Sequence, residues 1–356
     1  MMDLTLVPDG GLGWLDASGP MANVVLSTRI RLARNLTSVP FATRAAETDR
    51  RRILRDVERA WQEAATARGG VRFLLDELSA DERQLLHERH LVSKELMAAA
   101  AERAGQSGAA VFLSAHVGVM VNEEDHLRLQ TLVSGFAPGQ AYGQLDRLDH
   151  ELGAVLPYAF HREFGYLTAC PTNAGTGLRA SVLIHLPGLV LTKEIAKVLQ
   201  GLTQVGLTFR GLYGEGSEVV GNFFQLSNQT TLGKSEEDLL DHLGKIVRQV
   251  VAYEEQARQV LLRDASTIIE DKVWRAYATL RYARRLEFEE CMNLLSGVRL
   301  GVGLKLIPGL SVYTLNKLLI FTQPAHLAAL EERTTHDAEL RAVYVRRLLD
   351  DEAAAA

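Results

Sequence analysis

The spacing of apolar residues changes along the chain and divides it into parts with different expected structures. Between residues 48 and 68 apolar side chains recur every three or four positions, a period typical of an amphipathic helix. Shorter apolar runs, such as residues 117–121 and 178–186, are typical of strands. Beyond residue 255 the strand signals cease, and Leu, Ala, Arg and Glu dominate. The pattern predicts an α/β part followed by an all-helical part.

The individual elements follow from the same pattern. Ser79 with Glu82, and Ser235 with Asp238, have the spacing of a capping box, which marks the start of a helix. Glycine and proline punctuate residues 1–22, so we expect a loose N-terminal arm there. The expected helices cover residues 48–68, 79 to beyond 90, 142–156, 192–202 and 235–262. The expected strands cover residues 24–26 (leading into 27–35), 111–113, 117–121, 164–169, 178–186, 205–209 and 219–226.

The composition excludes several classes of protein. The chain has 356 residues, a net charge of −5 and 47% hydrophobic residues, values typical of a folded globular protein. Two cysteines are too few for a disulfide scaffold. There is no apolar stretch of about 18 residues and no basic N-terminal segment of a signal peptide. We therefore expect a cytoplasmic protein with no membrane partner, and the mild acidity argues against nucleic-acid binding.

Arginines and glycines gather in two segments. Arg29 and Arg31 lie two positions apart on an expected strand, so their side chains point to one face. Two such guanidiniums repel unless an anion joins them, and phosphate oxygens match their geometry; a solvated basic edge is the alternative. Residues 170–177 form a glycine-containing loop that precedes Arg179 and lacks the lysine of a P-loop. In it, Cys170 is either a small buried apolar side chain or a thiolate tuned by a charged site.

Carboxylates accompany arginines in two other segments. Residues 122–128 contain three adjacent acids, which form either a charged turn or a grip on a cationic nucleophile beside Arg128. Residues 210–216 place three glycines around Arg210 and Glu215, in either a plain surface loop or a mobile loop over a ligand. Arginines suit a nucleoside triphosphate, and glutamates suit a positively charged acceptor, so this inventory is sufficient for phosphoryl transfer. Walker A, HRD and DFG motifs are absent, as are CxxC, HExxH and EF-hand metal motifs.

These segments resemble the ATP:guanido phosphotransferase family. In family order the matches are STRIRLARN (27–35), NEEDHLR (122–128), CPTNAGTGLRASV (170–182) and RGLYGEGSE (210–218). ERHLVS (88–93) and residues 223–240 resemble the bacterial branch that acts on arginine in proteins. The resemblance implies an α+β fold: an arm at 1–22, an antiparallel-sheet catalytic domain flanked by helices at 23–255, and an all-helical C-terminal domain at 256–352 for dimerisation or regulation.

The resemblance also implies roles for individual residues. Glu124 and Glu215 would clamp the acceptor guanidinium, with Cys170 nearby as a tuning group. Mg²⁺ would bind to the ATP phosphates and not in a protein cage, so no residue is expected to ligate a metal directly. The residues expected along ATP are Ser27, Thr28, Arg29, Ile30, Arg31, His90, Arg128, Arg179, Ala180, Ser181, Val182, Leu183, Arg210, Gly211, Leu212, Tyr213, Gly214 and Glu215.

The implied activity is transfer of the ATP γ-phosphate to arginine residues of proteins, giving phosphoarginine and ADP. A kinase of free arginine or another small guanidine is the alternative, and a non-catalytic adaptor or scaffold is the second. The family's animal members carry a helical N-terminal domain that is absent ahead of Ser27, which favours an open acceptor site and hence proteins. The implied partners are substrate proteins with accessible arginines, an activator protein, the protease or chaperone machinery of stress response and protein quality control, and a second copy of the chain.

The C-terminal part departs from this branch at one motif. Members of the branch carry an Arg-Asp-x-x-Arg-Ala motif near the C-terminus, which is thought to bind phosphoarginine as a regulator. Aligning on Arg341 and Ala342 puts Asp337 and Ala338 where the Arg-Asp pair belongs, and a slip of one residue aligns His336 and Asp337 instead. In both alignments the first arginine is missing. We therefore predict weak or altered sensing of phosphoarginine by Asp337 and Arg341.

Overall fold

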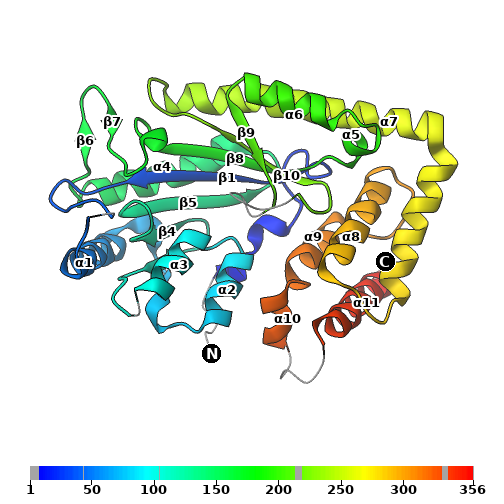
Figure 1. Ribbon diagram of the computed structural model, residues 1–356, viewed down its shortest axis with the longest axis horizontal. Helices are drawn as coiled ribbons and strands as arrows, with labels where there is room; N and C mark the ends of the chain where they lie inside the picture. Colours follow the sequence, from blue (N-terminus) through cyan, green and yellow to red (C-terminus); the bar gives the residue numbers. More distant parts are fainter. Residues whose placement is uncertain (1–7, 43, 104, 213–218, 331–335, 356) are drawn as a thin grey trace.

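The computed structural model describes residues 8–42, 44–103, 105–212, 219–330 and 336–355 (Figure 1). The strands are β1 Val25–Arg34, β2 Val71–Leu74, β3 Ala110–Leu113, β4 Gly118–Val121, β5 Leu127–Ser134, β6 Phe160–His161, β7 Gly165–Tyr166, β8 Leu178–His185, β9 Leu207–Arg210 and β10 Phe223–Asn228. The helices are α1 Glu47–Glu63, α2 Ala80–Glu88, α3 Lys94–Glu102, α4 Pro138–Gly153, α5 Pro187–Leu191, α6 Ile195–Gln204, α7 Glu236–Tyr282, α8 Phe288–Gly303, α9 Val312–Phe321, α10 Pro324–Leu330 and α11 Asp337–Ala355.

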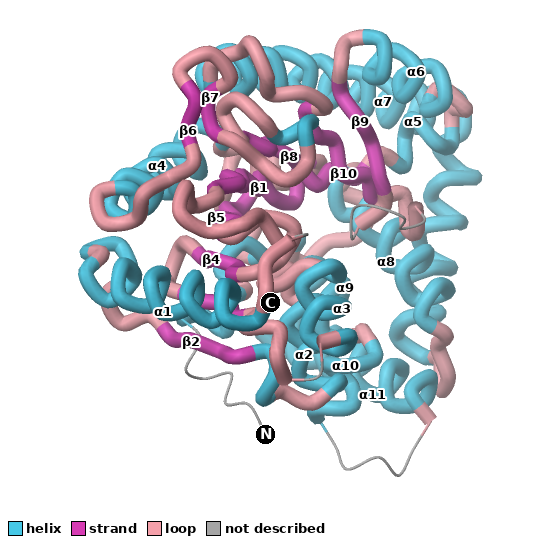
Figure 2. Tube along the Cα trace, turned by 60° about the vertical axis from the view of Figure 1, so that its left-hand side comes forward, coloured by secondary structure: helices cyan, strands magenta, loops and turns pink. Residues whose placement is uncertain are grey.

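Eight strands form one twisted sheet, in the order β2-β3-β4-β5-β1-β8-β10-β9, and every neighbouring pair is antiparallel. The expected antiparallel sheet flanked by helices is therefore confirmed. Both expected capping boxes are present, at the starts of α2 and α7. In Figure 2 the small β6–β7 hairpin lies apart from the main sheet, at the upper left, and α11 lies at the lower right.

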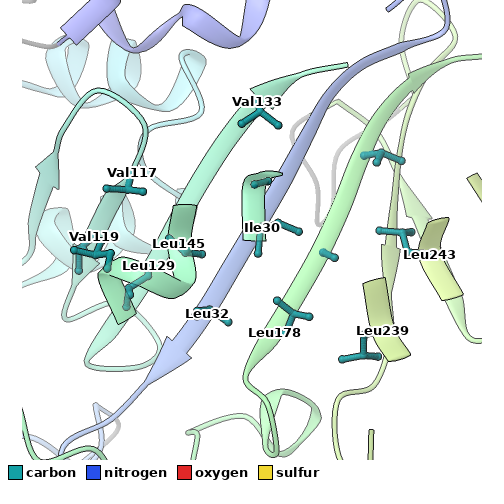
Figure 3. Packing of buried hydrophobic residues seen from close by; sticks show 14 of the residues in the cluster. Ile30, Leu32, Val117, Val119, Leu129, Val133, Leu145, Leu178, Leu239 and Leu243 are labelled. Carbon is teal, nitrogen blue, oxygen red and sulfur yellow. The ribbon is translucent and has the colours of Figure 1, made fainter. Parts of the chain in front are cut away.

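Strand alternation gives the sheet one apolar face. Ile30 and Leu32 on β1 and Leu178 on β8 point toward the same layer, where helices α4 and α7 cover them. Figure 3 shows Leu145 of α4 and Leu239 and Leu243 of α7 meeting this face. The intervening residues of the same strands therefore point to the opposite face, which α4 and α7 leave uncovered.

Helix α7 joins the sheet to the C-terminal helices without a loop. It continues 20 residues past the expected end near residue 262, and its backbone departs from helical geometry at Ala265 (φ −144°, ψ 30°). The proposed division at residue 255 therefore lies inside a helix, and two separate domains remain a prediction. Helices α7–α9 and α11 enclose a second apolar core, which also takes in Leu26, Leu183 and Phe223 of the sheet.

The N-terminal arm is not loose over residues 8–22. Trp14 and Leu15 are 5% and 1% exposed and belong to the second core. Asn316 Nδ2 donates to the carbonyl of Leu15 (2.8 Å), and Arg299 Nη2 donates to the carbonyl of Ala22 (2.7 Å). The sequence expectation was wrong here because the partners that bury the arm lie about 300 residues away, on α8 and α9.

Some element boundaries also differ from the expectation. Helix α2 ends at Glu88 and does not run past His90, because His90 has a φ of +60°, which a right-handed helix excludes. Strand β10 begins at Phe223 and not at residue 219. No helix in the described part of the chain is long and apolar enough to cross a membrane.

A buried polar cluster of Glu88, Arg89 and His326 joins the end of α2 to the start of α10. The Glu88 carboxylate accepts the amides of Ala325 (3.1 Å) and His326 (3.2 Å), and it also accepts the His326 Nδ1 proton (2.9 Å). Arg89 Nε donates to His326 Nε2 (3.1 Å), which fixes a neutral imidazole. The cluster thus attaches the C-terminal helices directly beside His90.

Glu88→Ala is expected to lower the free energy of unfolding by about 3 kcal/mol, because it leaves two buried amides and a buried imidazole without their acceptor. Urea unfolding of the full chain measures this loss. Glu77→Ala, at an exposed position in the same region, is the matched control and should change stability by less than about 0.5 kcal/mol. Equal stabilities of the two variants would contradict the role assigned to Glu88.

Candidate active site

The face of the sheet opposite α4 and α7 carries a group of arginines. Arg31 on β1 lies directly opposite Arg179 on β8 and opposite Gln130 on β5. Arg29 occupies the same face one pleat away, and Arg128 lies opposite Ala33. Three neighbouring strands therefore place four guanidiniums together, as strand alternation predicted for Arg29 and Arg31.

The arginine face lacks enough negative charge to balance it. Within the described residues, Arg31 has no carboxylate partner, and its buried Nε makes no hydrogen bond. In the part of the chain that the structure describes, Arg29 donates to Gln130 Oε1 (2.5 Å) and its buried Nε has no hydrogen-bond partner. Burial, and then the charge of Arg128, lower the pKa of Arg29 to about 10. Burial, and then the charge of Arg29, hold the pKa of Arg31 well below its ordinary value.

Unsatisfied guanidinium groups of this kind fit an anionic ligand. A triphosphate would supply acceptors to the unpaired Nε atoms and would neutralise the repulsion between Arg29 and Arg31. Arg210 on β9 pairs in register with Gln225 of β10, at the far edge of the sheet. Arg179 donates to Ser227 on β10 (3.3 Å). The face therefore extends as a polar strip from β5 to β9.

Glu124 lies at the end of this strip, in the turn between β4 and β5. Arg128 bonds the buried carboxylate of Glu123 (2.7 Å) and the partly exposed carboxylate of Glu124 (3.1 Å). Ser93 also donates to Glu123. Burial raises the pKa of Glu124 above its ordinary value, although Arg128 opposes the shift. Glu123 holds Arg128 in place, and Arg128 contacts only the Oε2 atom of Glu124. The second oxygen of Glu124 can therefore bind a cation that arrives from solution.

Asp125 attaches the Glu124 turn to the Cys170 loop. Its Oδ1 accepts the amide of Ala169 (2.6 Å) and the side-chain amide of Asn35 (2.6 Å). Since Ala169 precedes Cys170 and Asp125 follows Glu124, these bonds hold the two expected acceptor-site residues on adjoining segments. The thiol of Cys170 is partly exposed and lies 3.0 Å from Thr172 Oγ1.

The Cys170 loop also depends on close backbone packing. Gly177 has a φ of +66°, and a Cβ atom there would lie 2.6 Å from the carbonyl of Ala33 and 2.6 Å from Arg34 Nη1. A side chain at this position is therefore excluded by both conformation and space. Glycine at 177 lets β8 begin against the end of β1, which aligns Arg179 with Arg31.

His90 borders the arginine face on the other side. Gln130, which holds Arg29, also donates to the carbonyl of His90 (3.2 Å). The ring of His90 meets that of Trp14 edge to face at 5.5 Å, and both residues line a cavity of about 390 Å³. Burial, and then the charge of Arg29, hold the pKa of His90 well below its ordinary value, so the imidazole is neutral at pH 7.

Several residues expected along the nucleotide point elsewhere. Thr28 donates to the carbonyl of Gly135 (2.7 Å) and accepts the amide of Ala137 (3.0 Å), on the helix-covered face. The side chains of Ile30, Ala180 and Val182 lie in the apolar core on that face, and those of Leu183 and Leu212 lie in the second core. Side-chain contacts with a ligand on the arginine face are therefore excluded for Thr28, Ile30, Ala180 and Val182, in correction of the sequence expectation. Leu183 pairs with Ser27 and Gln225 on the arginine face itself, so its place along the nucleotide stays a prediction, as does that of Leu212. Ser27 is buried, Ser181 lies opposite Arg29, and Gly211 is buried next to Arg210.

Three expected site residues, Tyr213, Gly214 and Glu215, lie outside the described residues. The pairing of Glu124 with Glu215 around one guanidinium therefore stays a prediction.

Sequence reasoning left Glu123, Gln130, Asp125 and Asn35 without a role. The sequence could have indicated Gln130, because it lies two positions from Arg128 and therefore on the same face of the strand. The bonds made by Glu123, Asp125 and Asn35 depend on partners far away in sequence.

The expected regulatory residues have structural contacts. Arg341 is buried in α11, and its guanidinium donates to the carbonyls of Thr322 (2.8 Å) and Leu286 (2.8 Å). Asp337 is the first residue of α11. Arg341 therefore holds α11 against the ends of α9 and the α7–α8 connection. Whether Asp337 and Arg341 also respond to phosphoarginine stays a prediction.

Among the described residues, no three histidine, cysteine or acidic side chains come together as a metal site. The site thus offers positive groups for a phosphate chain and a carboxylate for a cation. An antiparallel sheet with such a face fits a protein that transfers a phosphoryl group to a cationic acceptor.

Comparison with known proteins narrows this class. Residues 52–257 match the model of the ATP:guanido phosphotransferase C-terminal catalytic domain, and residues 266–355 match that of the protein-arginine kinase McsB C-terminal domain. The chain belongs to the ATP:guanido phosphotransferase family. The second match begins next to the kink at Ala265.

Relatives and solved structures agree with this assignment. The chain is 44% identical to the protein-arginine kinase of Pelotomaculum thermopropionicum over 94% of each chain. It is 46% identical to that of Symbiobacterium thermophilum over 88% of this chain and 89% of the relative. A duplicated taurocyamine kinase from Schistosoma mansoni superposes with a TM-score of 0.60 at 27% identity, over 72% of this chain and 35% of that one. A lombricine kinase superposes with a TM-score of 0.56 at 25% identity, over 70% of this chain and 71% of that one.

Proposed function

We propose that this protein transfers the γ-phosphoryl group of ATP to the guanidinium of arginine residues in proteins, giving phosphoarginine and ADP. The observation that carries the proposal is the arginine face itself, where Arg29 and Arg31 keep buried donors without acceptors among the described residues and Arg128 pairs with the carboxylate of Glu124. The protein-arginine kinases of similar sequence support an arginine acceptor. Their similarity covers the C-terminal helices as well as the sheet.

The chemistry assigns separate tasks to the two ends of the site. A guanidinium is protonated, with a pKa above about 12, and has no free lone pair for attack. Glu124 orients the acceptor through a charged hydrogen bond and accepts the proton that leaves as the N–P bond forms. Arg29, Arg31, Arg128 and Arg179 hold the triphosphate and stabilise the charge of the transferring group. Asp125 and Asn35 fix the distance between the Glu124 turn and the Cys170 loop, so both reactants meet in one orientation.

Mg²⁺ belongs to the same proposal, as a cofactor bound to the ATP phosphates. The described residues supply no carboxylate cage for it, and the phosphate oxygens are suitable ligands. When bound there, the ion adds positive charge to that of the arginines.

The test is mass spectrometry of a protein mixture incubated with ATP, Mg²⁺ and the enzyme, under conditions that preserve the acid-labile N–P bond. Phosphate on arginine side chains, absent when Glu124→Ala replaces the wild type, is the expected result. Phosphorylation of free arginine alone would favour the small-guanidine alternative. No phosphorylation of either acceptor would favour a non-catalytic adaptor.

We further propose a cytoplasmic protein that acts as a homodimer with an activator and with protease or chaperone machinery, in stress response and protein quality control. These partners follow from the family branch. Membranes and nucleic acids are not among the proposed partners.

A further inference from the structure

The β6–β7 hairpin carries exposed aromatic side chains that neither core explains. Residues 160–164 are all exposed, and the rings of Phe160 and Phe164 are 59% and 47% accessible. His161 stacks on Phe164 with their ring centres 4.9 Å apart, and Phe160 meets Tyr166 edge to face at 5.3 Å, so the hairpin presents two pairs of aromatic rings. Figure 1 shows the hairpin projecting from the sheet at the upper left, away from helices α8–α11. We call residues Phe160–Tyr166 the aromatic hairpin.

The base of the aromatic hairpin is firmly attached. The guanidinium of Arg34, the last residue of β1, lies 3.5 Å from the centre of the Tyr166 ring and is itself paired with buried Asp149 (2.6 Å). The backbone of Tyr166 exchanges two hydrogen bonds with Gly175. Gly165 has a φ of +69°, and a Cβ there would lie 2.5 Å from the Gly175 carbonyl. The tip therefore has a fixed position relative to the Cys170 loop.

The same base reaches the acceptor end of the site. Asn35 donates to the carbonyl of Leu167 (3.1 Å) and also to Asp125, whose neighbour is Glu124. Cys170 follows Tyr166 by four residues. Phe160 pairs with Tyr166 and His161 with Gly165, so Phe160 lies at the base and Phe164 lies nearer the tip. At about 3.3 Å per residue, the three residues between Tyr166 and the tip extend it by at most roughly 10 Å from this base. An extended peptide covers that length with about three residues and needs further residues to continue from the base to Glu124.

Resting on the function proposed above, we propose that the aromatic hairpin docks the segment of a protein substrate that flanks the acceptor arginine. Exposed aromatic side chains on a hairpin with a fixed backbone provide contact area at little cost in conformational entropy. The exposed rings of the aromatic hairpin would contact apolar side chains of the substrate that lie four or five positions from its acceptor arginine. A free amino acid is too short to reach both Glu124 and the tip, so the hairpin contributes to the choice of proteins over small guanidines.

The test uses two 13-residue peptides with a central arginine, one with leucine and one with serine at the positions four and five residues away on both sides. The wild-type enzyme is expected to prefer the leucine peptide about tenfold in kcat/KM, mainly through KM. The double variant Phe160→Ser/Phe164→Ser is expected to lose that preference while its rate on the serine peptide and its KM for ATP stay the same. Ile268→Ser, which removes a 70% exposed side chain on α7, is the matched control and should keep the preference.

Each other result counts against the docking role. A wild type that does not distinguish the peptides, or a double variant that keeps the preference, overturns it. A double variant that slows both peptides equally indicates a structural role only. A fall in molecular mass in light scattering, seen with the double variant alone, would assign the hairpin to contact between copies of the chain. If wild type phosphorylates no arginine in any peptide or protein, the proposed function fails, whereas phosphorylation without a hairpin effect rejects docking alone.

Discussion

Glu124→Gln is expected to lower kcat for arginine phosphorylation by about 10³-fold or more. The amide keeps the size of the side chain but cannot attract the guanidinium as an anion or accept its proton. Because the proposed ATP site is the arginine face and not Glu124, the affinity for ATP should change little. Single-turnover transfer to a protein acceptor and ATP binding, measured separately, check both parts. Glu102→Gln, at an exposed position on α3, should keep full activity.

The pH dependence of wild-type activity is expected to follow the ionisation of Glu124. The proposed mechanism needs Glu124 ionised, and burial raises the pKa of this carboxyl above its ordinary value. Activity should therefore fall as the pH decreases, with the acid limb of kcat/KM at a higher pH than an ordinary glutamate would give. A profile that stays flat down to the ordinary pKa of glutamate would contradict Glu124 as the proton acceptor.

Arg31→Met is expected to have opposite effects on activity and stability. The substitution removes a guanidinium that the proposed mechanism places on the phosphate chain, so kcat/KM for ATP should fall by about 10³-fold. It also removes a buried charge that faces Arg29 and Arg179 without a counter-charge, so the nucleotide-free protein should gain about 1–2 kcal/mol. Steady-state kinetics and urea unfolding without nucleotide measure the two effects.

The sign of the stability change follows from the pKa of Arg31. A basic group whose pKa is lowered in the folded state carries its charge at a cost to folding, and removing the charge recovers that cost. Arg68→Met, at an exposed position, should change neither quantity. If Arg31→Met destabilises the free protein as much as it weakens activity, the charge is balanced by partners that the described contacts do not include.

Local patterns predicted those parts of the molecule that depend on nearby residues. Strand alternation placed Arg29 and Arg31 on one face, and the capping boxes located the starts of α2 and α7. The family motif was less precise, because it assigns Thr28 and Ile30 to the nucleotide equally with Arg29 and Arg31. The pleat of the strand sends alternate side chains into the helix-covered core.

Features that depend on distant partners were not predictable. Trp14 and Leu15 gave no periodic signal, and their burial depends on helices near the other end of the chain. Asp125 looked like one of three acids in a charged turn, and only its contacts with Asn35 and Ala169 show that it joins two loops. The left-handed backbone at His90 ended a helix that the apolar spacing alone would have continued.

The second apolar core has a practical consequence for dissecting the molecule. A fragment starting at residue 256 would lack Trp14, Leu15, Leu26 and Phe223, and the side of the C-terminal helices that they cover would meet water. It would also lose Glu88, the acceptor for the first amides of α10. Such a truncated piece should aggregate or unfold, so titrations with phosphoarginine are meaningful only on the intact polypeptide.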